Sequence, residues 1–290
     1  MANRRQLTKR RKAVRNIRKI TRTMQLIATA RFQAAFNRAV AARPYTEKLA
    51  ELVRDLSGPN VLHPLMQANE KATRSAVVVL TSMRGLCGGY NANVLRKTVE
   101  HIDGLKRNGV ETDVHMVGKK GVNYFRFLRR AMSEQTTSLG DAPRFDQVEP
   151  IANDLMARFE RGEIASAYVV YMRFLSASKQ RPHVLRLLPL SREETVEEKP
   201  SSSSAPQYEF SPDPESLLNE LLPATVRVRL FQCFNDAVVS EQIGRMVAMK
   251  AATDAAADMI TALTRKYNRA RQTQITMELL DIVGGANALA

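Results

Sequence analysis

The stretch that decides the fold lies near the amino end and reads LTKRRKAVRNIRKITRTMQLIATARFQAAFNRAVAA, residues 7–42. It contains neither Gly nor Pro and is rich in good helix formers, which predicts one long helix. Its apolar residues recur at intervals of three, four and seven, the spacing of one helical face. They are Leu7, Val14, Ile17, Ile20, Met24, Ile27, Ala34 and Ala35. Such a stripe is too narrow to bury itself, so this helix needs a partner.

A second long helix is predicted at the carboxyl end. Residues 224–283 contain one glycine, Gly244, and no proline, and the pair Gly284 and Gly285 follows as a predicted helix stop. The apolar positions alternate by three and four, as in a coiled coil. Two amphipathic helices at opposite ends of one chain can bury both stripes by pairing antiparallel. We therefore expect residues 1–56 and 217–290 to form a long antiparallel coiled coil.

Between these helices the pattern changes to strands alternating with helices. A β-branched run at 76–80 precedes a glycine-containing turn at 84–89. Further elements are expected at 91–107, 113–117, 119–131, 151–161 and 167–174. This alternation predicts a small Rossmann-like α/β domain at 74–190 on a mostly parallel sheet, with 183–190 as an edge strand. Residues 191–216, rich in Glu, Ser and Pro, are a predicted flexible linker.

The positive charge is concentrated at the amino end. The chain has 44 Lys and Arg against 29 Asp and Glu, a net charge of +15, and 13 of the cations precede the first acidic residue, Glu47. An acid-free basic helix fits a nucleic-acid arm, an organelle transit peptide, or an element seated against an acidic partner. Composition alone leaves these three interpretations open.

No arrangement of side chains typical of catalysis is present. The turn after the first strand reads G-x-x-G-G, which is neither a dinucleotide fingerprint nor a P-loop, so a tight strand-to-helix turn is favoured over a nucleotide site. The four histidines show no metal-ligand spacing, and Cys87 and Cys233 cannot form a multi-thiolate site. We expect no cofactor, no metal and no catalytic residue. No run approaches the ~20 apolar residues needed to span a bilayer.

Several blocks along the chain occur together, in order, in one known family. They are IRKITRTM at 17–24, RGLCGGYN at 84–91, LLPL at 187–190, RMVAMKAATD at 245–254, YNRARQ at 267–272 and IVGG at 282–285. In these blocks the chain resembles the γ subunit of F-type ATP synthase, and the resemblance covers nearly its whole length. Because it begins within the first dozen residues, it implies a bacterial-type chain without a cleaved transit peptide.

The resemblance implies a non-catalytic central-stalk rotor. The coiled coil is then threaded through a ring of three α and three β subunits, and the α/β domain stands as a foot on the c-ring of the membrane sector. The implied partners are the α, β and ε subunits and the c-ring, with no nucleic acid. The implied location is peripheral, on the cytoplasmic side of the cell inner membrane.

The resemblance also implies roles for particular residues. The implied ring contacts are Met24, Arg245, Arg271, Gln272 and Thr276. The implied apolar bearing tip is Leu279, Leu280, Ile282 and Val283. The implied foot turn contains Arg84, Gly85, Gly88 and Gly89. Two positions depart from the family pattern, since Met83 stands where Asp is usual and Ser211 where an acidic residue is common. A plant-type redox insertion with two nearby cysteines is absent.

Two other functions stay open from the residues alone. The first is a basic coiled-coil adaptor that binds nucleic acid or an anionic membrane surface through residues 4–22. The second is a nucleotide-dependent α/β enzyme that uses the turn at Gly85. DNA retention that is sensitive to salt would favour the adaptor, and saturable nucleotide binding would favour the enzyme.

Overall fold

The computed structural model describes residues 4–56, 63–67, 69, 72–190 and 214–289. One long helix stands at each end of the chain, α1 at Arg4–Leu56 and α5 at Pro214–Leu289. Both helices run through two compact units, of which one comprises residues 1–30 and 245–290 and the other residues 31–244. None of the described helices is long and apolar enough to cross a membrane.

In the first unit α1 and α5 pair in opposite directions. The hydroxyl oxygens of Thr21 and Thr253 lie 2.8 Å apart, and both residues are buried. The Arg11 guanidinium lies 4.7 Å from the centre of the Tyr267 ring, an attractive cation–π arrangement. Moving toward the amino end of α1 therefore moves toward the carboxyl end of α5. This confirms the predicted antiparallel coiled coil.

The buried stripe of α1 follows a strict seven-residue repeat, which differs from the predicted stripe. Its buried or half-buried members include Leu7, Val14, Thr21, Ala28 and Ala35, and a second series on the same face includes Arg11, Gln25, Phe32 and Ala39. Ile17, Ile20 and Ile27, which were predicted to lie on the stripe, are 52%, 59% and 48% exposed, and Ala34 is exposed as well. A seam with a seven-residue repeat keeps the same face toward the partner helix, and these residues lie off that face. The prediction was wrong for these four positions because Thr21 and Ala28, which continue the repeat of Leu7 and Val14, occupy the seam in place of the isoleucines.

A disulfide between positions 21 and 253 tests this register. In the Thr21→Cys/Thr253→Cys variant the two sulfurs replace hydroxyl oxygens that are 2.8 Å apart, so a disulfide of normal geometry can form with small shifts. We expect nearly complete cross-linking in mild oxidant, measured on a non-reducing gel. The matched control is Thr23→Cys/Thr253→Cys, because Thr23 is exposed. Equal cross-linking of the two pairs would contradict the register.

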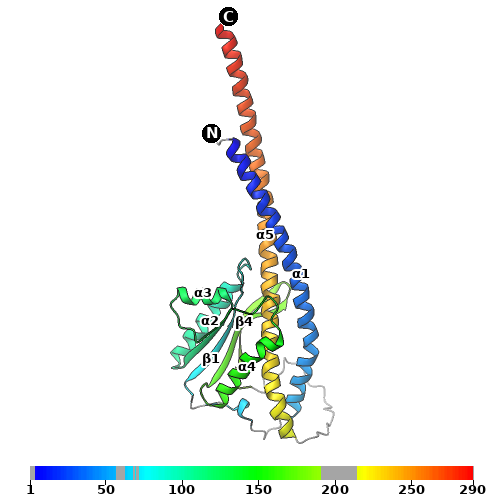
Figure 1. The fold of residues 1–290 in the computed structure, drawn as a ribbon, viewed down its shortest axis with the longest axis vertical. Coiled ribbons are helices and arrows are strands. Elements are labelled where there is room, and N and C mark those ends of the chain that lie inside the picture. Colours follow the sequence, from blue (N-terminus) through cyan, green and yellow to red (C-terminus); the bar gives the residue numbers. More distant parts are fainter. Residues whose placement is uncertain (1–3, 57–62, 68, 70–71, 191–213, 290) are drawn as a thin grey trace. The chain divides into compact units, whose positions relative to one another are not determined.

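The second unit is built on a five-stranded sheet with the order β3-β2-β1-β4-β5 (Figure 1). The strands are β1 at Arg74–Leu80, β2 at Glu111–Val117, β3 at Glu134–Thr136, β4 at Ser166–Ser176 and β5 at Lys179–Leu188. Neighbouring strands are parallel except β4 and β5, which form an antiparallel hairpin. This confirms the mostly parallel sheet with an added edge strand. The edge strand β5 begins four residues earlier than predicted, and β3 was not predicted.

The helices of this unit cover both faces of the sheet (Figure 1). They are α2 at Tyr90–Arg107, α3 at Lys119–Phe127 and α4 at Phe145–Glu160, together with a short 3₁₀ turn, η1, at Pro64–Met66. Helix α3 ends four residues before the predicted end, and Arg129 just beyond it has a positive φ of 52°, which a continuing α-helix does not allow. Helix α4 begins six residues earlier than predicted, where the Gln147 side-chain oxygen accepts a hydrogen bond from the Arg144 amide at 3.1 Å.

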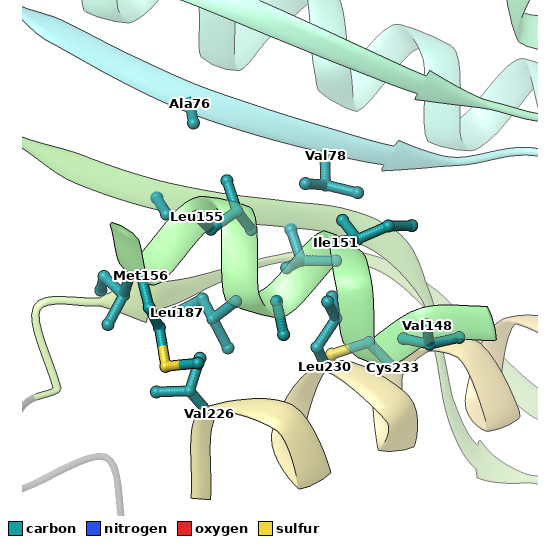
Figure 2. Packing of buried hydrophobic residues seen from close by; sticks show 14 of the residues in the cluster. Ala76, Val78, Val148, Ile151, Leu155, Met156, Leu187, Val226, Leu230 and Cys233 are labelled. Atoms are coloured by element: carbon teal, nitrogen blue, oxygen red, sulfur yellow. The ribbon is translucent and has the colours of Figure 1, made fainter. Parts of the chain in front are cut away.

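Strand β1 divides the core into two layers. Ala76 and Val78 face α4 and α5, whereas Val77 faces α2 and α3. Figure 2 shows α4 lying between the sheet and α5, with Leu155 and Leu230 among the buried side chains. The continuous run of buried residues in β1 is typical of a central parallel strand that is covered on both faces.

Helix α5 extends further at both ends than the sequence predicts. It begins at Pro214 and passes through Pro223, although the proline removes a backbone hydrogen bond. Leu218, Leu222 and Val226 are at most 1% exposed, and their burial holds this part of the helix against the core. At the other end the predicted stop at Gly284 is wrong, because a glycine permits a helix to end without forcing it to. Of the predicted linker, residues 191–213 lie outside the described residues and 214–216 belong to α5.

Candidate functional site

The basic residues at the start of α1 lie in the first unit and are almost all exposed. The exposed set is Arg4, Arg5, Lys9, Arg10, Lys12, Arg15, Arg18, Lys19 and Arg22. Arg11 differs, because it is half-buried over the Tyr267 ring. Most of the charge therefore lies on the surface of the helix pair, where it can attract an acidic partner.

The five residues expected to contact a ring fall into two groups. Met24 is half-buried and Arg245 is only 8% exposed, and both lie where α1 and α5 overlap along their lengths. Arg271, Gln272 and Thr276 are exposed, and the Thr276 hydroxyl donates to the Gln272 carbonyl at 3.0 Å. At 1.5 Å per residue, Arg271 lies roughly 39 Å further along α5 than Arg245. No single site can therefore contain all five.

The end of α5 is an exposed apolar helix. Leu279 and Leu280 are 58% and 57% exposed, and Ile282 and Val283 are 73% and 48% exposed. Met277, one turn earlier, is 51% exposed. Large apolar side chains grouped in this way indicate a surface that meets another molecule.

A second exposed apolar surface was missed by the sequence analysis. It consists of Ile17, Ile20 and Ile27 on α1, which had been placed on the seam between the helices. The seven-residue repeat that contains Leu7, Thr21 and Ala28 is the signal that could have revealed it. Exposed Arg18 and Arg22 lie among these isoleucines, and arginine is enriched at protein interfaces.

The turn between β1 and α2 is held by an internal network of hydrogen bonds. The Ser82 amide donates to Asn91 Oδ1 at 3.0 Å, and the Ser82 hydroxyl donates to the Arg84 carbonyl at 2.6 Å. Asn91 Nδ2 also contacts Cys87 Sγ at 3.2 Å. Within this turn Gly88 has a φ of 59°, a conformation that favours glycine. Of the predicted turn residues, Gly88 thus suits this backbone conformation, and the Arg84 side chain is exposed and lies 3.7 Å from Asp141.

The same turn packs closely against the backbone of α5. A Cβ atom added to Gly244 would lie 2.6 Å from the Cys87 carbonyl oxygen, which is closer than real contacts allow. The only glycine within the stretch 224–283 therefore stands where the helix backbone meets the turn. The cavity beside it, lined in part by Tyr90 and Phe234, has a volume of about 40 Å³, enough for a few water molecules. These contacts explain the turn as a packing element and give no support to the nucleotide-enzyme alternative.

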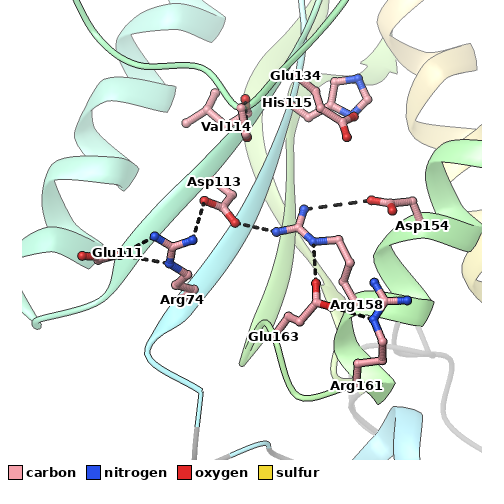
Figure 3. Close-up of polar contacts among 11 residues, drawn as sticks. Arg74, Glu111, Asp113, Val114, His115, Glu134, Asp154, Arg158, Arg161 and Glu163 are labelled. Atoms are coloured by element: carbon pink, nitrogen blue, oxygen red, sulfur yellow. Dashed lines mark hydrogen bonds and ion pairs between the residues drawn. The ribbon is translucent and has the colours of Figure 1, made fainter.

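Charged residues at the opposite end of the sheet form a paired network (Figure 3). Asp113 on β2 accepts from Arg158 on α4 at 2.5 Å and lies 3.8 Å from Arg74 on β1. Glu163 lies 3.5 Å from Arg158, and a hydrogen bond from Arg161 lowers the pKa of Glu163. Each carboxylate has a cationic partner, so the network ties α4 to the two strands and is structural.

Both cysteines are buried, which makes them poor nucleophiles. Burial and the nearby Asp236 raise the pKa of the Cys233 thiol to about 12. The thiolate is the reactive form, so Cys233 stays protonated at neutral pH. Cys87 is 2% exposed within the turn. Within the part of the chain that the structure describes, no group of His, Cys, Asp and Glu could hold a metal ion.

Two histidines of the second unit are held neutral by burial. His101 on α2 packs edge-on against Tyr168 on β4, with ring centres 4.6 Å apart, and its Nε2 has no hydrogen-bond partner among the described residues. Burial first, and Lys97 second, lower the pKa of His101. Burial also lowers the pKa of His115, although the Glu134 carboxylate 3.1 Å away opposes this change.

These shifts predict a loss of stability in acid. A histidine whose pKa is lower in the folded state binds its proton more readily when unfolded, so its contribution is complete above pH ~6.5 and declines below it. We expect the free energy of unfolding to fall from pH 7.5 to pH 5 by up to about 1.4 kcal/mol per pH unit for each such histidine. For the His101→Phe variant, the free energy of unfolding measured with urea should fall less steeply as the pH decreases. The same slope in wild type and variant would contradict the role of His101.

Comparisons with known proteins agree along the whole chain. A family model described as ATP synthase matches residues 3–289. The ATP synthase gamma chain of Rhodopirellula baltica is 47% identical over 294 residues, which cover 100% of this chain and 99% of that relative.

Two solved structures show a similar fold. A chain from the rotor of the Euglena gracilis mitochondrial ATP synthase in rotational state 1 matches with a TM-score of 0.63 at 16% identity, over 94% of this chain and 98% of that chain. A chain from the central stalk and c-ring of the Tetrahymena thermophila mitochondrial ATP synthase has a TM-score of 0.57 at 19% identity. The match covers 80% of this chain and 99% of that chain. At these identities the likeness establishes the fold.

Proposed function

We propose a rotor function for this chain, which belongs to the ATP synthase γ-chain family. It is the central-stalk subunit of an ATP synthase, and it couples ion flow through the membrane ring to conformational changes at the catalytic sites of the complex. Two structures of the same fold come from a rotor and from a central stalk, which supports this proposal.

One observation carries the proposal further than family membership. The antiparallel helix pair continues into a stretch of α5 in which every residue from 271 to 284 is exposed. Such a shaft has no threefold symmetry, so each of the three catalytic sites in a surrounding ring faces a different side of it at any moment. Turning the shaft changes which conformation each site prefers. A differential interaction of this kind can shift the affinity of each site for nucleotide.

We assign the chemistry of ATP to the partners and not to this chain. The partners are the α and β subunits of the ring, the ε subunit and the c-ring, and the location is the cytoplasmic side of the cell inner membrane. The sequence lacks a P-loop, which supports a non-catalytic role. The adaptor alternative receives no support from the comparisons, because they match ATP synthase over nearly the whole chain.

Three sets of residues divide the work in this proposal. Met24, Arg245, Arg271, Gln272 and Thr276 contact the ring, and Leu279, Leu280, Ile282 and Val283 form an apolar bearing. The turn with Arg84, Gly85, Gly88 and Gly89 belongs to the foot. In this proposal the helices at 1–56 and 217–290 form the shaft, residues 74–190 form the foot domain, and residues 191–216 form the linker.

The contacts of the foot with ε and the c-ring do not depend on a carboxylate at position 83 in this proposal. Met83 packs against the buried cluster of the second unit, so it serves the core. Ser211, the other departure from the family pattern, lies outside the described residues.

Reconstitution tests this proposal. Mixing the purified chain with ATP synthase α and β subunits from the same source should give one complex that contains a single copy of this chain and hydrolyses ATP. The chain alone should hydrolyse none. Failure to form the complex, or ATP hydrolysis by the chain alone, would overturn the proposal.

A further inference from the structure

The second unit ends at Arg31 on α1 and at Gly244 on α5. Both helices continue beyond these residues. Any twist that passes along the two helices must therefore enter or leave the second unit at this level of the chain. The contacts that hold the helices here decide how firmly the α/β domain follows them.

The turn after β1 holds both helices. It meets α5 at Gly244, where the Cys87 carbonyl oxygen leaves no room for a Cβ atom. It is also tied to α1 by charge, because Arg84 of the turn lies 3.7 Å from Asp141 and Arg31 of α1 forms an ion pair with the same carboxylate. The Asp141 side chain is only 22% exposed, so this shared pair is partly shielded from solvent.

The β4–β5 hairpin holds the same two helices independently. Phe174 near its tip packs edge-on against Phe36 of α1, with ring centres 5.9 Å apart. Phe174 also borders a small buried cluster of both helices that includes Ala39 and Ile243. One turn before Gly244, the Ser240 hydroxyl of α5 donates to the Met172 carbonyl of β4 at 3.1 Å.

We propose that these contacts form a collar that transmits torque between the foot domain and the helix pair. The collar consists of Arg31, Phe36, Cys87, Asp141, Phe174 and Gly244. Each helix is held by two different elements at the same level, so neither can turn without breaking a contact. The collar residues are positioning residues, since they hold α1 and α5 to the α/β domain within the second unit. This inference rests on the proposed rotor function.

The test measures the angular stiffness of this joint in the assembled complex. The ring is fixed to a surface, a gold particle is attached through an Arg107→Cys substitution on the exposed end of α2, and the spread of particle angles is recorded during catalytic pauses. We expect Gly244→Ala and Phe174→Ala each to raise the angular variance at least twofold, while ATP hydrolysis by the ring stays within twofold of wild type. A loss of folding stability alone would not broaden the angles of molecules that still rotate.

Matched controls make the outcome decisive. Gly104→Ala is the same substitution in another helix, at a glycine with no atom within 4 Å of the added Cβ. Leu175→Ala truncates the exposed neighbour of Phe174. Both should leave the variance unchanged. Equal variance in wild type and the two collar variants would overturn the inference.

A charge exchange tests the collar even if Gly244→Ala or Phe174→Ala fails to assemble. Arg31→Asp alone should raise the variance, and Arg31→Asp with Asp141→Arg should restore it when Arg84→Gln is included, because Arg84 would otherwise repel the new cation. Absence of both effects would overturn the inference. A wild-type complex that hydrolyses ATP without turning the particle would instead overturn the proposed function, so the two failures can be told apart.

Discussion

Replacing Arg271 and Gln272 together by alanine lowers ATP synthesis and ATP-driven ion pumping about tenfold or more in reconstituted complexes. Both side chains are exposed on α5, so their removal costs the fold little. The proposed ring contact would partly desolvate them, and a hydrogen bond that involves a charged group then contributes about 1.5–3 kcal/mol. A tenfold change corresponds to about 1.4 kcal/mol, so the loss of one such bond is sufficient. The measurement compares hydrolysis, synthesis and pumping in the same vesicles.

The control for this experiment is Arg265→Ala with Thr261→Ala. It removes one cation and one neutral polar group from exposed positions of the same helix. We expect wild-type rates for this control. If the Arg271/Gln272 variant also kept wild-type hydrolysis, synthesis and pumping, both residues would be solvated surface, and the assignment of ring contacts should then be abandoned.

Neutralising Arg10, Arg15 and Arg18 with glutamine should weaken assembly with the ring about 3- to 140-fold at low salt. Exposed ion pairs contribute about 0.2–1 kcal/mol each, so three of them account for this range. The effect should shrink in 1 M salt, where the screening length falls to about 3 Å. Arg11 is left in place because its contact with Tyr267 stabilises the helix pair. The measurement is a titration of ring subunits at two salt concentrations.

Charge-matched substitutions in the foot serve as the control for the basic helix. Arg96, Lys106 and Lys119 are exposed and lie on α2 and α3. Changing all three to glutamine lowers the net charge by the same amount, and assembly should be unaffected. Equal weakening by the two triple variants would mean that net charge, and not the basic helix, drives assembly. Tight binding of the wild-type chain to duplex DNA at physiological salt would also contradict this account.

The sequence was sufficient to predict the elements with strong periodic or β-branched signals. Leu7–Ala42 lacks helix breakers, and the run at 76–80 has few alternatives to a buried strand, so α1 and β1 were predicted correctly. The three-residue strand β3 carries no such signal, because its pairing with β2 depends on its position in the finished sheet. Short edge strands are set by tertiary contacts more than by local preference.

The α1 seam shows why hydrophobicity alone does not identify the buried face of a coiled-coil helix. Ile20 is more apolar than Thr21, yet Thr21 is buried against Thr253 and Ile20 is 59% exposed. A helix that contacts both a partner helix and a second surface carries two apolar faces. When the apolar residues of both faces are counted together, the seven-residue spacing of the seam is hidden. Thr21 and Ala28 are seven residues apart. When such small residues are counted as seam positions, the seam can be told apart from the second apolar face.

The individual contact residues could be proposed only through family resemblance. Gln272 and Thr276 are exposed polar residues on a helix, and nothing in their local sequence distinguishes them from solvated surface. Gly244 is different, since a lone glycine in a long helix suggests a close approach of another backbone. The partner in that approach, the Cys87 carbonyl, becomes visible only when the two elements are placed together.

Observation of rotation in single complexes tests the central claim most directly. The ring is fixed to a surface and a particle is attached to this chain through an Arg107→Cys substitution at an exposed position of α2. With ATP, this account predicts rotation in one direction, with one step for each of the three catalytic sites. A ring that hydrolyses ATP at the normal rate while the bound chain stays still would contradict it.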